Sequence, residues 1–290
     1  MDIFVQVTAS GLALGCVYAL VALGFVLIYK ATEVMNFAQG ELMMVGAYIY
    51  FSLTTSFGLS PLPALLATLI LAALLGAFIE RVVMHPLIDE EPFILVMVTI
   101  GLATVLRAVT GMIWSHDTYD ILSPIPDTTL HFAGAIIPLI DAWTVIGTMI
   151  LSLLLFVFFK YTRTGTAMRA VAQNRYAAQL MGISVQRMFT LTWALATVVG
   201  AIGGIFLADI SYLHTNMGFI GLRALPAMFL GGMDSIPGAL LGGLVIGLAE
   251  NLSGVYVGGG VKEIVAYVIL LAILLIRPTG FFGTPEEKRV

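Results

Sequence analysis

The chain has 290 residues, of which 60% are hydrophobic and 10% are charged, with 13 Lys and Arg against 17 Asp and Glu. Because soluble domains carry roughly a quarter charged residues, this composition excludes a secreted protein, a cytosolic enzyme and a nucleic-acid-binding protein. The apolar residues suffice for roughly eight or nine helical spans of a lipid bilayer. We therefore expect an all-α, polytopic transmembrane helical bundle in which residues 1–290 form a single domain.

Nine apolar runs follow one another along the chain. They cover residues 8–29, 42–57, 61–79, 92–114, 143–159, 188–208, 217–232, 237–249 and 263–276. The last three are shorter than an ideal span, as tilted helices or helices broken inside a protein can be. We expect about eight to ten spans, with about nine as the best number.

The basic residues predict the orientation, because Lys and Arg gather on the cytoplasmic side of membrane proteins. The segment 160–187 contains five of them and no acidic residue, so it is expected in the cytoplasm. Alternating outward from this segment places five further basic residues inside: Lys30, Arg81, Arg277, Lys288 and Arg289. The N-terminus is then outside and the C-terminus inside, which requires an odd number of spans.

Polar residues interrupt the apolar pattern first at 30–41, KATEVMNFAQGE. The distribution of charge predicts a cytoplasmic turn, although the Ala, Met and Phe residues would also allow the segment to re-enter the membrane. Asn36, Gln39 and Glu41 could bind a polar substrate or gate its path. Alternatively, they cap helices at a tight turn.

Two arginines, Arg107 and Arg223, lie well inside apolar runs and have no partner visible in the sequence. Such charges mark either a functional site or a structural ion pair. The acidic candidates all lie near the predicted ends of spans: Glu33, Glu41, Glu80 and Glu250. An ion-coupled secondary transporter usually carries acidic residues or broken helices near the middle of the membrane, so this alternative is weaker but open.

The loop 115–142 is the longest external connection, and Pro124, Pro126 and Pro138 stiffen it. It is either a site for an extracellular partner or an ordinary surface connection.

The cytoplasmic segment contains a regular apolar pattern between Gly165 and Gly182. The residues that recur at nearly helical spacing are Met168, Val171, Ala172, Ala178 and Met181. They predict a short amphipathic helix that Gly182 ends. The helix could lie on anionic lipid or dock into a groove of a cytoplasmic partner, and the residues alone favour lipid.

Glycine is dense between residues 218 and 247. Pairs at a spacing of four residues allow helices to approach closely in lipid, and we expect packing as their main role. Pro226 and Pro237 could turn the same region into a hinge. The glycines expected to pack or hinge are Gly231, Gly232, Gly238, Gly242, Gly243 and Gly247.

Four blocks of sequence occur in order along the chain. They are YALVALGFVLIYKATEVMNFAQGELMMVGAY at 18–48, GTAMRAVAQNRYAAQLMGI at 165–183, GFIGLRALPAMFLGGMDSIPGALLGGLVIGLAE at 218–250 and RPTGFFG at 277–283. Together they resemble the permeases of branched-chain amino-acid ABC transporters, of the LivH type, over nearly the whole chain.

The resemblance implies a multi-pass permease of the bacterial inner membrane that works by alternating access. Its implied partners are a second homologous permease, two ATPase subunits and a periplasmic binding protein that delivers the amino acid. The segment 160–187 would couple the permease to the ATPases. The implied coupling residues are Gly165, Arg169, Asn174, Ala177, Ala178 and Gly182. Sister permeases of similar sequence carry urea, short amides or other amino acids, so the cargo is not decided.

An enzyme is not expected. A P-loop needs a lysine after a glycine, and none of Lys30, Lys160, Lys262 and Lys288 follows one, so ATP and Mg²⁺ would bind the partner ATPases and this chain would bind no cofactor. Four scattered histidines and one cysteine predict no metal site. The pairs of residues that an intramembrane protease needs are also missing, because Tyr119–Asp120 falls in a loop and no histidine lies inside a predicted span.

Overall fold

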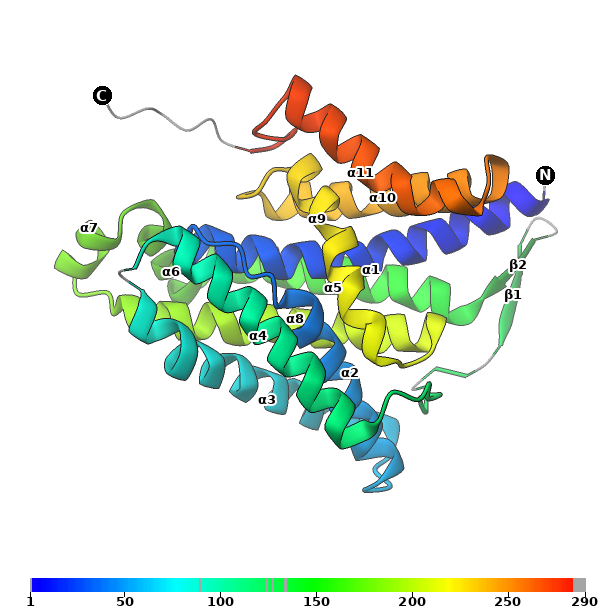
Figure 1. Cartoon of the computed structure of the whole chain (residues 1–290), viewed down its shortest axis with the longest axis horizontal. Coiled ribbons are helices and arrows are strands. Elements are labelled where there is room, and N and C mark those ends of the chain that lie inside the picture. Colours follow the sequence, from blue (N-terminus) through cyan, green and yellow to red (C-terminus); the bar gives the residue numbers. More distant parts are fainter. Residues whose placement is uncertain (1, 89, 124, 127, 133–134, 284–290) are drawn as a thin grey trace.

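The computed structural model describes residues 2–88, 90–123, 125–126, 128–132 and 135–283, and these ranges are largely helical (Figure 1). The long helices are α1 (Asp2–Thr32), α2 (Gln39–Thr55), α3 (Pro61–Ile79), α4 (Pro92–Trp114), α5 (Leu139–Tyr161), α8 (Val185–Ser211), α10 (Ile236–Tyr256) and α11 (Gly259–Ile276). The shorter helices are α6 (Arg163–Gln173), α7 (Arg175–Leu180) and α9 (Ile220–Gly231). A π-helical turn at Glu80–Met84 extends α3, and 3-10 turns lie at His85–Leu87 and Thr215–Phe219. Among the predicted features, Pro124, Lys288 and Arg289 lie outside the described residues.

In the described ranges, seven helices are long and apolar enough to cross a membrane: α1, α3 with its extension, α4, α5, α8, α10 and α11. The second and seventh predicted runs form α2 and α9, which have 17 and 12 residues. A 12-residue helix is about 18 Å long, much less than the hydrocarbon thickness of a bilayer. The structure thus confirms a helical membrane bundle. The predicted number of nine spans is not confirmed, and the orientation stays a prediction.

The two ends of the bundle differ. Figure 1 places the start of α1 and the β-hairpin at one end, and α6 and α7 at the opposite end. The hairpin consists of β1 (Thr129–Phe132) and β2 (Ala135–Pro138), paired antiparallel. The predicted outer loop therefore contains regular structure, which departs from the all-α prediction. A bridge between Tyr119 and Leu213 ties the start of this loop to the chain after α8.

Helix α1 is the core of the molecule, because 89% of its most apolar 18-residue stretch is buried inside the protein. A helix that is apolar all round is expected to be buried in this way. It packs against α10, α8, α9 and α5. Gly15 allows α1 and α10 to touch, because a Cβ atom there would lie 2.9 Å from the Gly243 carbonyl oxygen.

The six glycines singled out in the sequence lie at contacts of α9 and α10. Gly243 and Gly247 face α1, Gly242 faces Ala227 of α9, Gly238 and Gly231 face each other, and Gly232 lies against Gly283. Gly232 also has a φ of +107°, so the turn between α9 and α10 requires a residue without a Cβ atom.

The connection between α1 and α2 lies inside the protein. Gln39, the first residue of α2, contacts Gly24 of α1 and Gly200 of α8. Because Gly200 is near the middle of the 27-residue α8, the chain after Thr32 turns back and α2 starts partway along the bundle. Most of the segment 34–41 is therefore buried inside the protein, and its cytoplasmic position or its re-entry into the membrane stays a prediction.

The cytoplasmic segment forms two helices instead of one. Asn174 has an extended backbone that separates α6 from α7, and its side chain accepts a hydrogen bond from the Ala177 amide at 2.9 Å. Gly182, with a φ of +80°, ends the segment as predicted. Of the predicted apolar stripe, Met168, Val171 and Ala178 are buried. Met181 is 82% exposed, because the break at Asn174 changes the direction of the second helix.

Candidate functional site

The bend before α2 contains three buried polar residues that the sequence singled out. Asn36 and Gln39 are fully buried and Glu41 is 2% exposed. The Asn36 side chain accepts a hydrogen bond from the Ala38 amide, and the Gln39 amide group donates one to the Ala196 carbonyl of α8. These two hydrogen bonds stabilise the bend, but neither caps a helix, because the N-cap residue of α2 is Ala38 and has no side-chain cap. Their part in gating stays a prediction.

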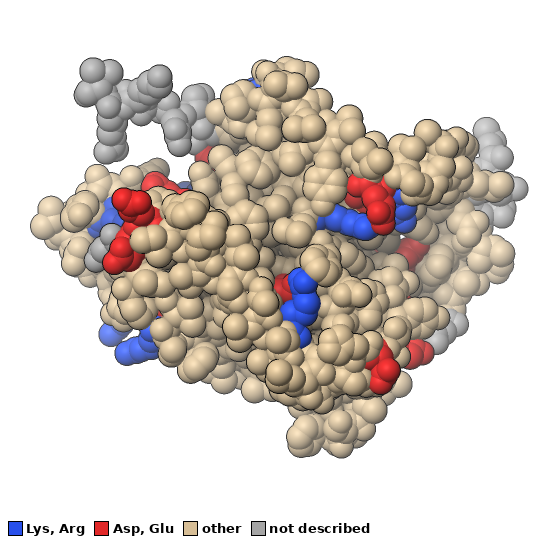
Figure 2. Space-filling model, viewed as in Figure 1, with Lys and Arg blue, Asp and Glu red and all other residues tan. Residues whose placement is uncertain are grey.

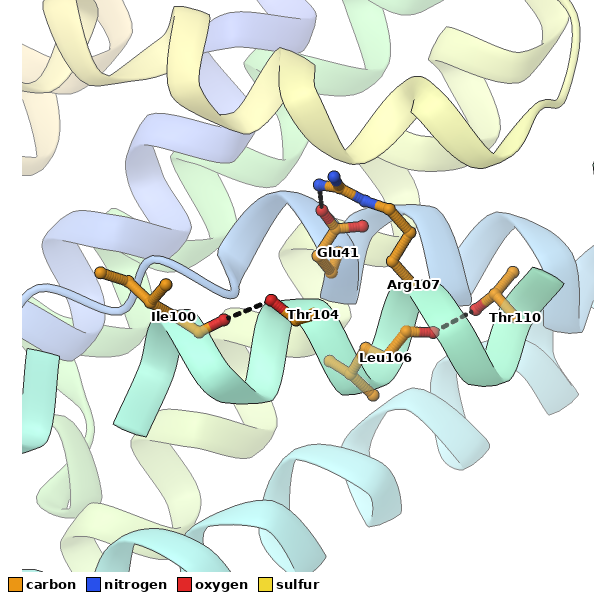
Figure 3. Close-up of polar contacts among 6 residues, drawn as sticks. All are labelled: Glu41, Ile100, Thr104, Leu106, Arg107 and Thr110. Atoms are coloured by element: carbon orange, nitrogen blue, oxygen red, sulfur yellow. Dashed lines mark hydrogen bonds and ion pairs between the residues drawn. The ribbon is translucent and has the colours of Figure 1, made fainter. Parts of the chain in front are cut away.

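Glu41 forms an ion pair with Arg107 of α4 inside the bundle (Figure 3). The Glu41 side chain is 3% exposed and that of Arg107 is 31% exposed. The guanidinium also lies over the Phe219 ring, 3.7 Å from its centroid. The partner that the sequence did not show for Arg107 is therefore 66 residues away along the chain.

Helices α2 and α9 begin beside this ion pair. α2 starts at Gln39 and α9 starts at Ile220, and their first turns touch at Gly40 and Gly221. A Cβ atom on Gly40 would collide with the Gly218 carbonyl and with Gly221, so only glycine fits. The N-terminal end of a helix carries partial positive charge, which favours a carboxylate at Glu41. Transporters use such interrupted helices to build polar sites within the membrane.

A small, partly open cavity extends from this bend toward the α6–α7 end of the bundle. Its polar lining includes Asn36 and Thr99 near the bend, Glu80 in the extension of α3 and Arg175 at the start of α7. The Thr190 hydroxyl donates a hydrogen bond to Glu80. The cavity therefore joins the buried bend to the predicted coupling segment. The sequence pattern gave no signal for this group, since its members come from five different parts of the chain.

Arg175 connects α7 to the end of α1. Its guanidinium donates a hydrogen bond of 2.8 Å to the Thr32 carbonyl and lies 5.2 Å from the Phe189 ring centroid. Arg175 thus links α7 directly to the residues that precede the buried bend.

The predicted coupling residues fall into two groups. Gly165 packs on Phe158 and Phe159 of α5, and Ala178 is buried. The other four are exposed: Arg169, Asn174, Ala177 and Gly182. The structure adds three large exposed apolar residues at the tip of this segment: Tyr176 at 82%, Leu180 at 89% and Met181 at 82%. We call Tyr176, Leu180 and Met181 the α7 knob.

A second polar group lies between α1, α9, α10 and α11. The Tyr18 hydroxyl donates a hydrogen bond of 2.6 Å to Glu250, which is fully buried within α10. Arg223 pairs with Glu263 at 2.9 Å. The expectation that Glu250 lies at the end of a span is wrong, because α10 continues beyond it to Tyr256.

Residues 7–276 match the family model described as branched-chain amino acid transport system / permease component. The chain belongs to this family. It is 31% identical to the high-affinity branched-chain amino acid transport system permease protein LivH of Salmonella typhimurium, over 99% of this chain and 98% of that protein. It is also 31% identical to the permease protein BraD of Pseudomonas aeruginosa, with the same coverage.

Among solved structures, PsaBC from Streptococcus pneumoniae in complex with Fab shares the fold of this chain. The TM-score is 0.52 at 15% sequence identity, and the match covers 96% of this chain and 93% of the other. This likeness concerns the fold alone.

Proposed function

We propose that the chain is the membrane-spanning permease subunit of an ABC importer that carries branched-chain amino acids across the bacterial inner membrane. The observation that carries this proposal is the similarity to LivH and BraD over 99% of the chain. The proposed complex contains a second homologous permease, two ATPase subunits that bind ATP and Mg²⁺, and a periplasmic binding protein that delivers the cargo.

The α7 knob is the proposed contact with an ATPase. Its three side chains are largely exposed, and α7 lies at one end of the molecule (Figure 1). Covering exposed apolar surface with a groove of another protein lowers the free energy of the complex. Arg169, Asn174, Ala177 and Gly182 would surround this contact, while Gly165 and Ala178 hold the segment against the bundle.

Coupling then follows from the cavity and from Arg175. Closure of the ATPases would push α7, and the hydrogen bond from Arg175 to the Thr32 carbonyl would carry this movement to α1. The buried bend at Asn36, Gln39 and Glu41 follows α1 directly, so it is suited to open or close the path next to the cavity. The tightly packed glycines of α9 and α10 are the proposed contacts about which the helices rearrange.

Reconstitution tests the proposed function. The chain is placed in liposomes with its second permease, the ATPases and the binding protein, and leucine uptake is measured with and without ATP. We expect uptake that requires ATP and the binding protein. Uptake that follows a proton or sodium gradient without ATPases would contradict the proposal, and uptake of urea or short amides in place of leucine would assign a different cargo.

A pair of variants tests the docking surface. Leu180→Asp places a charge in the α7 knob and should reduce association with the ATPase by about tenfold or more, since a central apolar contact is lost. Gln186→Asp is the control, because Gln186 is exposed in the first turn of α8, outside the α7 knob. Equal association of both variants with the ATPase in detergent would show that the α7 knob is not the contact.

A further inference from the structure

The Glu41–Arg107 pair lies at a depth where charge is expensive. Arg107 lies about two turns from the C-terminal end of the 23-residue helix α4, and its side chain remains 31% exposed. Figure 2 shows basic and acidic side chains together at the centre of a face that is otherwise largely uncharged. A guanidinium at this depth in contact with lipid tails costs several kcal/mol, so its open side must face water or protein.

The surface of α4 around Arg107 includes several small side chains beside larger ones such as Ile100 and Val105. Gly101 has open space at its missing Cβ atom, and Thr104 and Ala108 of α4 are exposed. Thr104 lies one turn before Arg107 and on the same side of the helix (Figure 3). These residues leave room next to the charges, instead of covering them as large side chains would.

Both members of the pair have unused capacity for hydrogen bonds. The Oε2 atom of Glu41 is buried without a partner, and so is the Nε atom of Arg107. Buried polar atoms without partners are uncommon in proteins and call for a specific explanation. A ligand that supplies a donor to Glu41 and an acceptor to Arg107 would satisfy both.

We propose that Glu41 and Arg107 form a transit site for the charged backbone of a zwitterionic amino acid. Arg107 binds the α-carboxylate of the cargo, and Glu41 binds its α-ammonium group. As the cargo enters, Arg107 exchanges the Glu41 carboxylate for the α-carboxylate of the cargo, and Glu41 exchanges the guanidinium for the α-ammonium group. No ion is therefore left unpaired in the membrane. The nearby N-terminal ends of α2 and α9 also favour the carboxylate. The aliphatic side chain lies against Phe219 and the small residues of α4.

This assignment rests on the proposed function, and it deepens it by giving the permease a site for the part that all amino acids share. The transit site does not distinguish one amino-acid side chain from another. An uncharged cargo such as urea would gain nothing from the exchange of charges.

The first test removes both charges together. A single substitution would leave a buried ion without its partner and could prevent folding. The double variant Glu41→Gln, Arg107→Gln replaces both charges by neutral amides; it keeps the size of the Glu41 side chain and shortens that of Arg107. We expect its ATP-dependent leucine uptake to fall by about tenfold or more, with ATPase association unchanged. Uptake within about twofold of wild type would show that the pair is only structural.

Asp141→Asn is the matched control for this variant. Asp141 is also buried, at 5% exposure, and accepts a hydrogen bond from Ser10 at 2.8 Å, but it belongs to α5 at another part of the bundle. Its uptake should stay near the wild-type value. Arg107→Lys should recover part of the lost uptake, because the charge returns without the planar fork.

The second test asks whether water and leucine reach the site. Thr104→Cys is treated in the complete transporter with a charged, membrane-impermeant methanethiosulfonate reagent, with and without leucine-loaded binding protein and ATP. We expect the reagent to modify Thr104→Cys, and we expect leucine to slow this modification. Val105→Cys is the control, since Val105 is 58% exposed at the same depth but on a different side of α4. The native Cys16 is fully buried, so background modification is low.

Two outcomes would overturn the transit site. These are an unmodified Thr104→Cys in a transporter that takes up leucine, and modification that cargo does not slow. If the wild-type complex takes up no leucine at all, the proposed function fails instead, so the two failures are distinguishable.

Discussion

Gly40 and Glu41 are neighbours in the chain. The position of Gly40 leaves no space for a side chain, whereas that of Glu41 holds a charged one. Gly40 brings the first turns of α2 and α9 into contact, and this contact encloses the carboxylate of Glu41. The ion pair with Arg107 then replaces the water that the carboxylate has lost. The position of the charge therefore depends on a residue that takes no part in the chemistry.

Gly40→Ala should lower the stability of the subunit by about 1–3 kcal/mol, because the added methyl group meets backbone atoms that cannot rotate away. Gly101→Ala is the control, since open space surrounds that position in α4. There the change should be neutral or stabilising by up to about 1 kcal/mol, as alanine favours a helix. Thermal unfolding in detergent measures both, and equal unfolding temperatures would contradict the assigned contact.

At the scale of elements, α7 is joined to the bundle through few contacts, of which Arg175 is the most specific. Its hydrogen bond to the Thr32 carbonyl and its position beside the Phe189 ring connect α7 to α1 and α8. Removing this connection separates the docking of an ATPase from the movement that docking should cause.

Arg175→Ala should therefore leave ATPase association intact, while the leucine transported per ATP falls by about tenfold as a charged hydrogen bond is lost. Arg187→Ala changes an exposed arginine in the first turn of α8 and should keep the wild-type ratio. Simultaneous measurement of uptake and phosphate release in liposomes gives the ratio. A loss of ATPase association with Arg175→Ala would place this residue in the docking surface instead.

The helices themselves could largely be predicted, because each apolar run gives a local signal. The runs 61–79 and 92–114 coincide with α3 and α4. The pairing of Glu41 with Arg107 could not be predicted, since hydropathy says nothing about which residues meet across 66 positions. Asn36 and Gln39 stand out in the sequence because they are polar residues between two apolar runs. Their burial depends on how the chain turns back after Thr32, which local composition allowed but did not require.

For the whole molecule, the distribution of basic residues predicts that α6 and α7 face the cytoplasm and that the hairpin faces outward. Tyr176→Cys and Thr129→Cys place single thiols on these exposed segments, and the native Cys16 is buried. In intact cells an impermeant thiol reagent should label Thr129→Cys alone. After permeabilisation it should label both, and labelling of Tyr176→Cys in intact cells would reverse the orientation.

The position of α1 also has a consequence for biogenesis. This helix is made first, yet the helix that it packs against most extensively is α10, which is made almost last. Tyr18 obtains its partner Glu250 only after 232 further residues have been added. The nascent N-terminal segment must therefore wait in the bilayer, protected by lipid or by the insertion machinery. A ribosome that stalls before α10 leaves a product whose central helix lacks its most extensive contact, and we expect membrane proteases to recognise it.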